Sequence, residues 1–315
     1  KMNYLKDYRE GEKFVGTYLC KQKQILKTKA GKTYYSLTLQ DKTGTADGKI
    51  WELNNGIANF EPMDYIHCEG MVTSFQGNLQ MNISRVRISD EGEYDPTDYV
   101  PCTNKDVGEM FSRILKYVAS VQNKYLRKIL EMYFVENKEF VDAFKKHSAA
   151  KSVHHGFMGG LLEHTLSVTD MCQYFAEHYP MIHRDLLITA ALFHDMGKIQ
   201  EISDFPMNDY TDDGQLLGHI YIGARCMENA AAQIPNFPPK LKNELVHCIL
   251  AHHGKMEFGS PKVPAIMEEM ALHMADNADA KLQTLTEVFT QAGDNMGWLG
   301  FNRMFESNLR KTSEE

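Results

Sequence analysis

A short helical stretch that is apolar on every side limits what this chain can fold into. Residues 186–194 read LLITAALFH and contain no charged side chain before the histidine. A helix without a polar face must be covered by other elements all round. We therefore expect a bundle of helices with this segment at its centre. Gly197 follows closely and is expected to cap the C-terminus of the helix.

Side chains that commonly bind metals lie at the end of this helix. His194 and Asp195 fall in the last turn, where their side chains diverge by about 100° and the helix dipole favours a cation. A buried His-Asp pair can instead be a plain hydrogen bond, and for the dipeptide alone this is the simpler interpretation. Similar side chains recur at predicted helix ends or faces, and this favours a metal site: His164, His219, His252, His253 and Asp276.

The chemistry of this set narrows the choice of metal. It offers imidazole and carboxylate groups and no thiolate, which suits Mn²⁺, Fe²⁺, Zn²⁺ or Mg²⁺ with open coordination positions. Asp195 has two carboxylate oxygens and can bridge two ions about 3.5–4 Å apart, an arrangement that activates water and steadies phosphoryl oxygens.

The second part of the chain has a helical pattern that we expect to continue to the C-terminus. Two helices are predicted within 103–134 from apolar residues at a period of 3.6. Further helices are predicted at 160–179, at 186–194, from His219 to just before Pro235, at 241–253 and at 264–289.

The first part of the chain has a strand pattern. Strand-like runs separated by turn residues lie at 14–29, 33–40, 45–52, 64–75 and 78–88, with a short helical piece expected at 54–60. Five strands with an insert after the third suggest a small antiparallel barrel of the OB type. The predicted fold is therefore multidomain, with an all-β OB barrel followed by an all-α helical bundle.

An acidic stretch with two prolines and no periodicity separates these parts. We expect an OB-fold nucleic-acid-binding domain at 1–90, a linker at 91–102 and a helical region at 103–315, whose core spans about 150–290.

The charge of the chain is unevenly distributed. The net charge is −8, yet residues 1–89 carry 13 basic against 9 acidic side chains, and six lysines and no acid lie between Lys13 and Gln40. Alternation places Tyr34 and Trp51 on an outward face of the barrel, where OB folds stack bases of single strands. The candidate nucleic-acid contacts in this domain are Tyr34, Trp51, Lys21, Lys23 and Lys32. Alternatively, the lysines form a solvated face and the aromatic rings pack on the neighbouring domain.

Composition bears on the cellular compartment. The six cysteines show no CxxC spacing, no apolar run reaches about 18 residues, and the N-terminus lacks the pattern of a signal peptide. We expect reduced thiols, no membrane association and a cytoplasmic location. Exposed aromatic and methionine positions leave room for a homo-oligomer.

Several motifs together resemble a known family. His164, the pair His194 and Asp195, and Asp276 match the HD-domain phosphohydrolase superfamily, and His219 with His252 match its binuclear branch. The sequences GGLLEHT at 159–165, FHDMGK at 193–198, YTDDGQLLGH at 210–219, HHG at 252–254, GSP at 259–261 and ADNADA at 275–280 resemble the YhaM-type 3′-to-5′ exoribonucleases. A preceding OB domain is the order in that family, so the resemblance covers nearly the whole chain.

The resemblance implies metal-dependent removal of nucleotides from the 3′ end of single-stranded RNA, with single-stranded DNA left open. Two divalent ions are implied, with Mn²⁺ expected first. The first ion would be held by His164, His194, Asp195 and Asp276, and the second by Asp195, His219 and His252. The ions would lower the pKa of a bridging water that attacks phosphorus in line with the leaving oxygen.

Other residues near these motifs are expected to assist. Lys198 is placed to neutralise a phosphate oxygen, unless it is a surface lysine on a loop. His253 would contact the strand, donate a proton or merely cap its helix, while His154 and His155 are candidates for phosphate contact. Asp279 is expected to orient a ligand from outside the metal site. With Asp195, the expected catalytic residues are Lys198 and His253.

Two other functions remain open at this stage. The same metal centre would serve a nucleotide or cyclic-dinucleotide phosphodiesterase. A non-catalytic protein that binds single strands would instead have lost a ligand, and all six expected ligand positions are occupied by suitable side chains.

Overall fold

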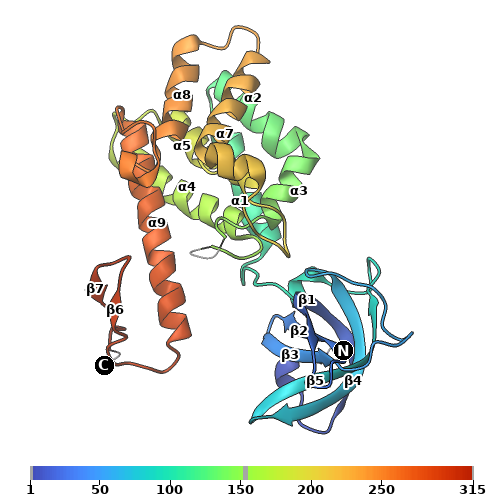
Figure 1. The fold of residues 1–315 in the computed structure, drawn as a ribbon. Coiled ribbons are helices and arrows are strands. Elements are labelled where there is room, and N and C mark those ends of the chain that lie inside the picture. The colour runs from blue at the N-terminus through green and yellow to red at the C-terminus, as the bar shows by residue number, and fades with distance from the viewer. Residues whose placement is uncertain (1–2, 152–154, 314–315) are drawn as a thin grey trace. The chain divides into compact units, whose positions relative to one another are not determined.

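The computed structural model describes residues 3–151 and 155–313. These residues form two compact units, which divide after Cys102 except that Phe205–Met207 group with the first unit (Figure 1). In the described part of the chain, no helix combines the length and the apolar character needed to cross a membrane.

The first unit is a closed five-stranded barrel followed by a short packed segment, which confirms the OB-type expectation. The strands follow one another around the barrel in the order β1-β2-β3-β5-β4, and the β3–β5 pair is parallel. Leu37, Leu39 and Ile50 point into the barrel core and are buried. The strands are β1 (Lys13–Lys27), β2 (Thr33–Asp41), β3 (Gly44–Ile50), β4 (Tyr65–Phe75) and β5 (Asn78–Ile88).

The prediction of a short helix at 54–60 is wrong. The Asn54 side chain accepts a hydrogen bond of 2.8 Å from the Gly56 amide, and the Ile57 amide bonds the Asn54 carbonyl at 3.0 Å. Such a turn competes with a helix for the same backbone groups. Ile57 then forms an isolated bridge to Val86.

The segment that we expected to be a linker packs on the barrel. The ring of Tyr94 stacks on that of Tyr65 at 4.1 Å, and Tyr99 is buried beside them. Gln40 donates a hydrogen bond of 2.9 Å to the Tyr99 carbonyl. Aromatic rings therefore hold residues 94–99 to the barrel even though their sequence has no regular period.

The second unit is a bundle of helices around α5. All residues from Leu186 to Phe193 are buried, and α5 contacts α1, α2, α4, α8 and α9. The central position expected from the apolar sequence is therefore observed. The helices are α1 (Val107–Ser120), α2 (Lys124–Glu131), α3 (Lys138–Lys146), α4 (Gly160–His178), α5 (Arg184–Phe193), α6 (Lys198–Glu201), α7 (Asp212–Ala232), α8 (Pro239–Ala251) and α9 (Met267–Gln291).

The expectation that helix continues to the C-terminus is wrong beyond α9. A small hairpin of β6 (Phe301–Asn302) and β7 (Ser307–Asn308) follows the helix (Figure 1). Gly293 and Gly300 have φ angles of 53° and 92°, a conformation that glycine adopts easily and that ends a helix. These glycines therefore explain why the helix does not continue where the sequence pattern predicted it.

Gly197 lets the backbone of α7 come close to its own backbone. It does not form the left-handed helix cap that the sequence predicted. Its φ angle is −63°, which any residue adopts. A Cβ atom at this position would lie 2.1 Å from the His219 carbonyl oxygen and 2.9 Å from the Gly223 amide nitrogen. The absence of a side chain allows α7 to approach the turn that carries Asp195.

We predict that Gly197→Ala destabilises the helical unit, because the added methyl group overlaps the backbone of α7. Overpacking of this kind costs about 1–3 kcal/mol, which lowers Tm by roughly 2–12 °C for a unit of this size. Gly108→Ala in α1 is the control, since its nearest neighbour would be the Asp106 side-chain oxygen at 3.1 Å. Equal Tm values for the two variants would refute the packing argument.

One carboxyl group lies in the core of this unit without a partner. Glu269, in the first turn of α9, is fully buried, and neither of its oxygens has a hydrogen-bond partner among the described residues. Burial raises the pKa of Glu269 to about 8. The folded protein therefore favours the protonated, neutral form.

The raised pKa of Glu269 predicts how the stability of the protein changes with pH. The folded state holds the Glu269 proton more tightly than the unfolded state, so the free energy of unfolding falls as pH rises from about 4.5 towards 8. In Glu269→Gln this part of the decline is absent, and the Tm advantage of the variant should grow between pH 5 and pH 8. Glu257→Gln, at an exposed position, controls for the loss of a charge. A constant Tm difference across this pH range would contradict the assignment.

Candidate metal centre

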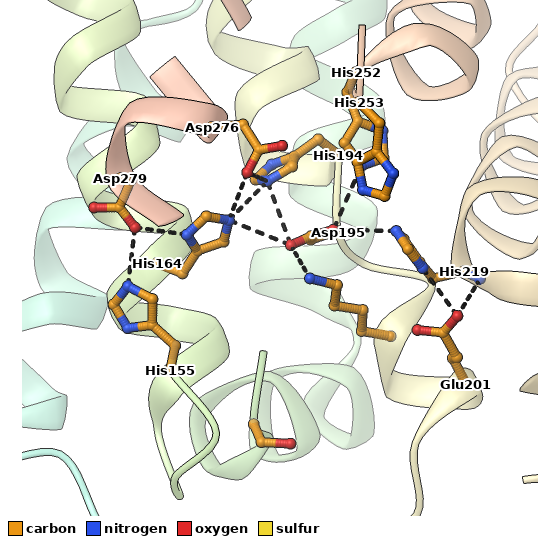
Figure 2. Close-up of polar contacts among 12 residues, drawn as sticks. His155, His164, His194, Asp195, Glu201, His219, His252, His253, Asp276 and Asp279 are labelled. Carbon is orange, nitrogen blue, oxygen red and sulfur yellow. Dashed lines mark hydrogen bonds and ion pairs between the residues drawn. The ribbon is translucent and has the colours of Figure 1, made fainter. Parts of the chain in front are cut away.

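All six expected metal ligands converge inside the helical unit (Figure 2). His194 and Asp195 lie in the turn after α5, at its junction with α6. The other ligands come from or directly follow further helices: His164 from α4, His219 from α7, His252 from the end of α8 and Asp276 from α9. No single helix therefore holds the site, and the bundle must be assembled before the ligands meet.

The first group of donor atoms surrounds one carboxylate oxygen of Asp195. His164 Nε2 lies 3.3 Å from Asp195 Oδ2 and 3.2 Å from Asp276 Oδ1. His194 Nε2 lies 3.5 Å from the same Asp195 oxygen and 3.2 Å from His164 Nε2. Donor atoms that each lie about 2.0–2.2 Å from one ion are separated from one another by distances close to these values of 3.2–3.5 Å. This group fits a single divalent cation.

The second group surrounds the other oxygen of Asp195. His219 Nε2 and His252 Nε2 each lie 3.6 Å from Asp195 Oδ1. All three atoms are buried and lack a hydrogen-bond partner among the described residues. Buried polar atoms without a partner are costly unless a ligand satisfies them. Their convergence fits a second cation and places the Asp195 carboxylate between the two groups.

Two of the imidazole rings are oriented by backbone carbonyls. His194 Nδ1 donates to the Ala191 carbonyl at 2.8 Å, and His252 Nδ1 donates to the Ile249 carbonyl at 2.7 Å. Each acceptor lies three residues earlier at the end of a helix, where carbonyls lack intrahelical partners. A proton on Nδ1 leaves the Nε2 lone pair free to bind a metal.

The other two rings are oriented by carboxylates. His164 Nδ1 lies 2.7 Å from Asp279 Oδ2, as expected for an Asp279 that orients a ligand. His219 Nδ1 lies 2.9 Å from Glu201 Oε1 (Figure 2). Glu201 was not among the residues predicted from the sequence. The signal available was a carboxylate only six residues after Asp195, in the same turn-and-helix segment.

The protonation of the first group changes when a cation binds. Burial alone would lower the pKa of His164, but hydrogen bonds to Asp195, Asp276 and Asp279 outweigh it and raise the pKa well above its usual value. Burial lowers the pKa of His194 to about 4, so this ring is neutral. A metal ion bound by His164 must therefore displace a proton from that ring.

The position of Lys198 differs from that of a surface lysine. Its side chain is only 13% exposed, and Nζ lies 2.7 Å from Asp195 Oδ2. Burial would lower the pKa of Lys198, but the Asp195 carboxylate raises it, so the side chain stays charged. Lys198 thus places a positive charge inside the centre.

His253 lies at the edge of the second group. It is partly exposed, and its Nδ1 lies 2.8 Å from the Phe258 carbonyl. A nitrogen of this ring lies within 4.8 Å of the ligand nitrogens of His219 and His252. Burial, with His252 and His219 nearby, lowers the pKa of His253 to about 4, so the ring is neutral.

The structure does not place His155 where it could meet a phosphate group. The ring is buried, and its Nε2 lies 2.9 Å from Asp279 Oδ2. The expectation of phosphate contact is therefore wrong for His155, because Asp279 holds the ring beneath the metal centre. His154 lies outside the described residues.

In the barrel unit, the two aromatic candidates stack on each other, with Trp51 exposed and Tyr34 partly buried. The rings of Tyr34 and Trp51 stack at 4.6 Å with an interplanar angle of 28°, and Trp51 is 40% exposed. Trp51 Nε1 donates to Asn82 Oδ1 at 3.1 Å. Neighbours within the barrel thus fix the orientation of the pair.

The three lysine candidates differ in their surroundings. Lys23 Nζ donates to the Phe60 carbonyl at 2.6 Å and lies 4.7 Å from the centre of the Tyr35 ring. Lys32 forms an exposed ion pair with Glu52 at 3.3 Å. Lys21 is exposed on β1. Lys23 therefore has a structural role in the barrel, and Lys21 and Lys32 are the more accessible cations.

The chain matches one family model within the helical unit and known relatives over most of its length. The family model described as the HD domain matches residues 161–281. The chain is 31% identical over 262 residues to the 3′-5′ exoribonuclease YhaM of Bacillus subtilis (strain 168), covering 81% of each protein. It is 32% identical over 293 residues to the 3′-5′ exoribonuclease YhaM of Listeria innocua serovar 6a, covering 90% of each.

Among solved structures, the second OB-fold domain of replication protein A from Methanococcus maripaludis resembles the barrel region weakly. The match covers 29% of this chain and 98% of that domain, with 20% identity and a TM-score of 0.24.

Proposed function

Because the chain belongs to the family of YhaM 3′-5′ exoribonucleases, we propose that it removes nucleotides from the 3′ end of single-stranded RNA by metal-dependent hydrolysis. The observation that supports this most strongly is the buried Asp195 carboxylate, whose two oxygens each face a separate group of imidazole nitrogens. A centre of this kind suits hydrolysis of phosphodiester bonds.

The donor set agrees with two divalent cations. It consists of imidazole nitrogens and carboxylate oxygens, and Mn²⁺ accepts both types well. When bound, two such ions lower the pKa of a water molecule and neutralise charge on the phosphoryl oxygens. His164, His194 and Asp276 would hold one ion, His219 and His252 the other, and Asp195 both.

The remaining side chains act on the substrate in this proposal. Lys198 carries a buried positive charge beside Asp195 and would stabilise a non-bridging phosphate oxygen. The neutral ring of His253 is the more exposed of the histidine pair and would contact the strand or accept a proton.

The barrel would hold the strand before cleavage. Trp51, stacked on the partly buried Tyr34, offers an exposed aromatic ring for a base, and Lys21 and Lys32 offer charge for phosphates. A strand is therefore a better substrate for this chain than a lone nucleotide.

We predict that Asp195→Ala abolishes hydrolysis, because both metal positions lose their shared ligand. The loss should exceed about 100-fold, the upper end of effects seen for outer-shell partners of metals. Binding of single-stranded RNA should remain close to wild type. The measurement is shortening of a 5′-labelled single-stranded RNA with Mn²⁺, with Mg²⁺ and with a chelator, alongside the metal content of each protein.

Asp142→Ala, at an exposed position on α3, is the matched control. Full activity of Asp195→Ala with metal present would refute the site. Parallel reactions with single-stranded DNA, mononucleotides and a cyclic dinucleotide define the substrate class. Cleavage of only the small nucleotides would favour the alternative phosphodiesterase.

We predict that Trp51→Ala weakens the binding of single strands without slowing hydrolysis at the metal centre. Loss of one stacked base should weaken binding of a long single strand roughly 5- to 150-fold, which corresponds to ~1–3 kcal/mol. Cleavage of a dinucleotide should be unchanged, because so short a substrate reaches the metal centre without the barrel. Tyr174→Ala, which removes an exposed ring from α4, is the control. Equal losses on both substrates would contradict separate roles.

A further inference from the structure

We propose that each metal position has its own supporting carboxylate, so that one position can be weakened without the other. Glu201 supports the position of His219, and Asp279, held by His155, supports the position of His164. This inference rests on the two-metal centre of the proposed function. It assigns His155 and Glu201 as positioning residues.

Glu201 fixes both the ring and the backbone of His219. Its Oε1 accepts a hydrogen bond of 2.9 Å from His219 Nδ1 and one of 3.0 Å from the His219 amide. The amide is available because α7 is interrupted at Gly218, where φ is 73° and ψ is 154°. One oxygen thereby sets the direction in which His219 Nε2 points.

Glu201 is itself held firmly in place. Its carbonyl accepts a hydrogen bond of 2.9 Å from the Thr211 amide. A Cβ atom on Gly214 would lie only 2.2 Å from that carbonyl oxygen, so the start of α7 packs directly on the end of α6. The side chain of Glu201 is also mostly buried, at 11% exposure, so few other partners compete for its carboxylate. A fixed oxygen acceptor is what a metal-binding imidazole needs on its far side.

Asp279 plays the same part for His164 through a larger network. Its Oδ2 lies 2.7 Å from His164 Nδ1 and 2.9 Å from His155 Nε2, while its Oδ1 accepts a hydrogen bond from Ser167. Both carboxylate oxygens are therefore engaged. Removal of His155 would leave Oδ2 with His164 as its only partner among the described residues.

The backbone around His155 is arranged to present this ring. His155 has a φ angle of 59°, which is uncommon for a residue with a side chain. Its amide donates to Glu287 at 3.2 Å and its carbonyl accepts from the Ala149 amide at 3.0 Å. A Cβ atom on Gly160 would lie 2.0 Å from the His155 carbonyl oxygen. Three separate contacts thus hold a strained residue in position, and this points to a role for its side chain.

The two supports are independent of each other. Glu201 ends α6 and bonds His219, whereas Asp279 lies in α9 and bonds His164, His155 and Ser167. In the described parts of the chain, no hydrogen bond joins one set to the other. Mutations in the two sets should therefore act on different ions.

The experiment measures Mn²⁺ affinity for each position separately in the full chain. Asp276→Ala disables the first position and His219→Ala the second, and free Mn²⁺ is followed by electron paramagnetic resonance during titration. Glu201→Ala or His155→Ala is then added to each background. We expect Glu201→Ala to weaken binding about 10- to 100-fold with Asp276→Ala and to leave it unchanged with His219→Ala. His155→Ala should show the opposite pattern.

Conservative variants and a matched control guard against general loss of structure. Glu201→Gln keeps an oxygen acceptor and His155→Gln keeps a nitrogen donor, so each should restore most of the affinity lost at its own position. His178→Ala, an exposed histidine on the same helix as His164, should have no effect. Circular dichroism establishes that each variant is folded. If an alanine variant unfolds, the Gln variant of the same residue is measured instead. It must still lower the Mn²⁺ affinity of the position that the residue supports more than that of the other position.

The proposal is overturned if either support variant weakens both positions equally or weakens neither. Failure of the proposed function gives a different result, since the wild-type chain would then bind fewer than two ions or bind two without shortening RNA.

Discussion

The side chains that converge inside the helical unit are arranged around the buried carboxylate of Asp195. Burial of this charge is costly, and nearby Lys198 and the surrounding histidines hold the pKa of Asp195 well below its usual value. The two oxygens face opposite groups of donors, with His164 and His194 on one side and His219 and His252 on the other. A residue at the end of a central, apolar helix thus lies between the two groups of donors that we propose to bind metal ions.

The packing of the helices fixes the positions of the donor side chains in this centre. Gly197 lets α7 approach the turn that carries Asp195, and the break at Gly218 directs His219 inward. Each imidazole proposed as a metal ligand has an acceptor behind it, either a backbone carbonyl at a helix end or a carboxylate. Stability and function are therefore coupled, because the same contacts that pack the helices also orient the ligands.

Sequence patterns predicted the features that depend on local periodicity or motif spacing. Strand-like runs between turn residues predicted the barrel strands, and the apolar run at 186–194 predicted the central helix. Glu201 was missed because its role arises only when α7 folds back onto α6. His155 was misassigned because a histidine at the surface and one beneath a metal site look the same in a sequence. The turn at 54–60 and the end of α9 depended on side-chain bonding and glycine conformations that override helical patterns.

Anomalous diffraction from crystals grown with Mn²⁺ shows whether Asp195 bridges two cations held by ligands from separate helical elements. If it does, two peaks lie about 3.5–4 Å apart, one beside His164, His194 and Asp276 and the other beside His219 and His252, with Asp195 between them. A single peak, or peaks away from Asp195 in a protein that cleaves RNA, would rule out this arrangement.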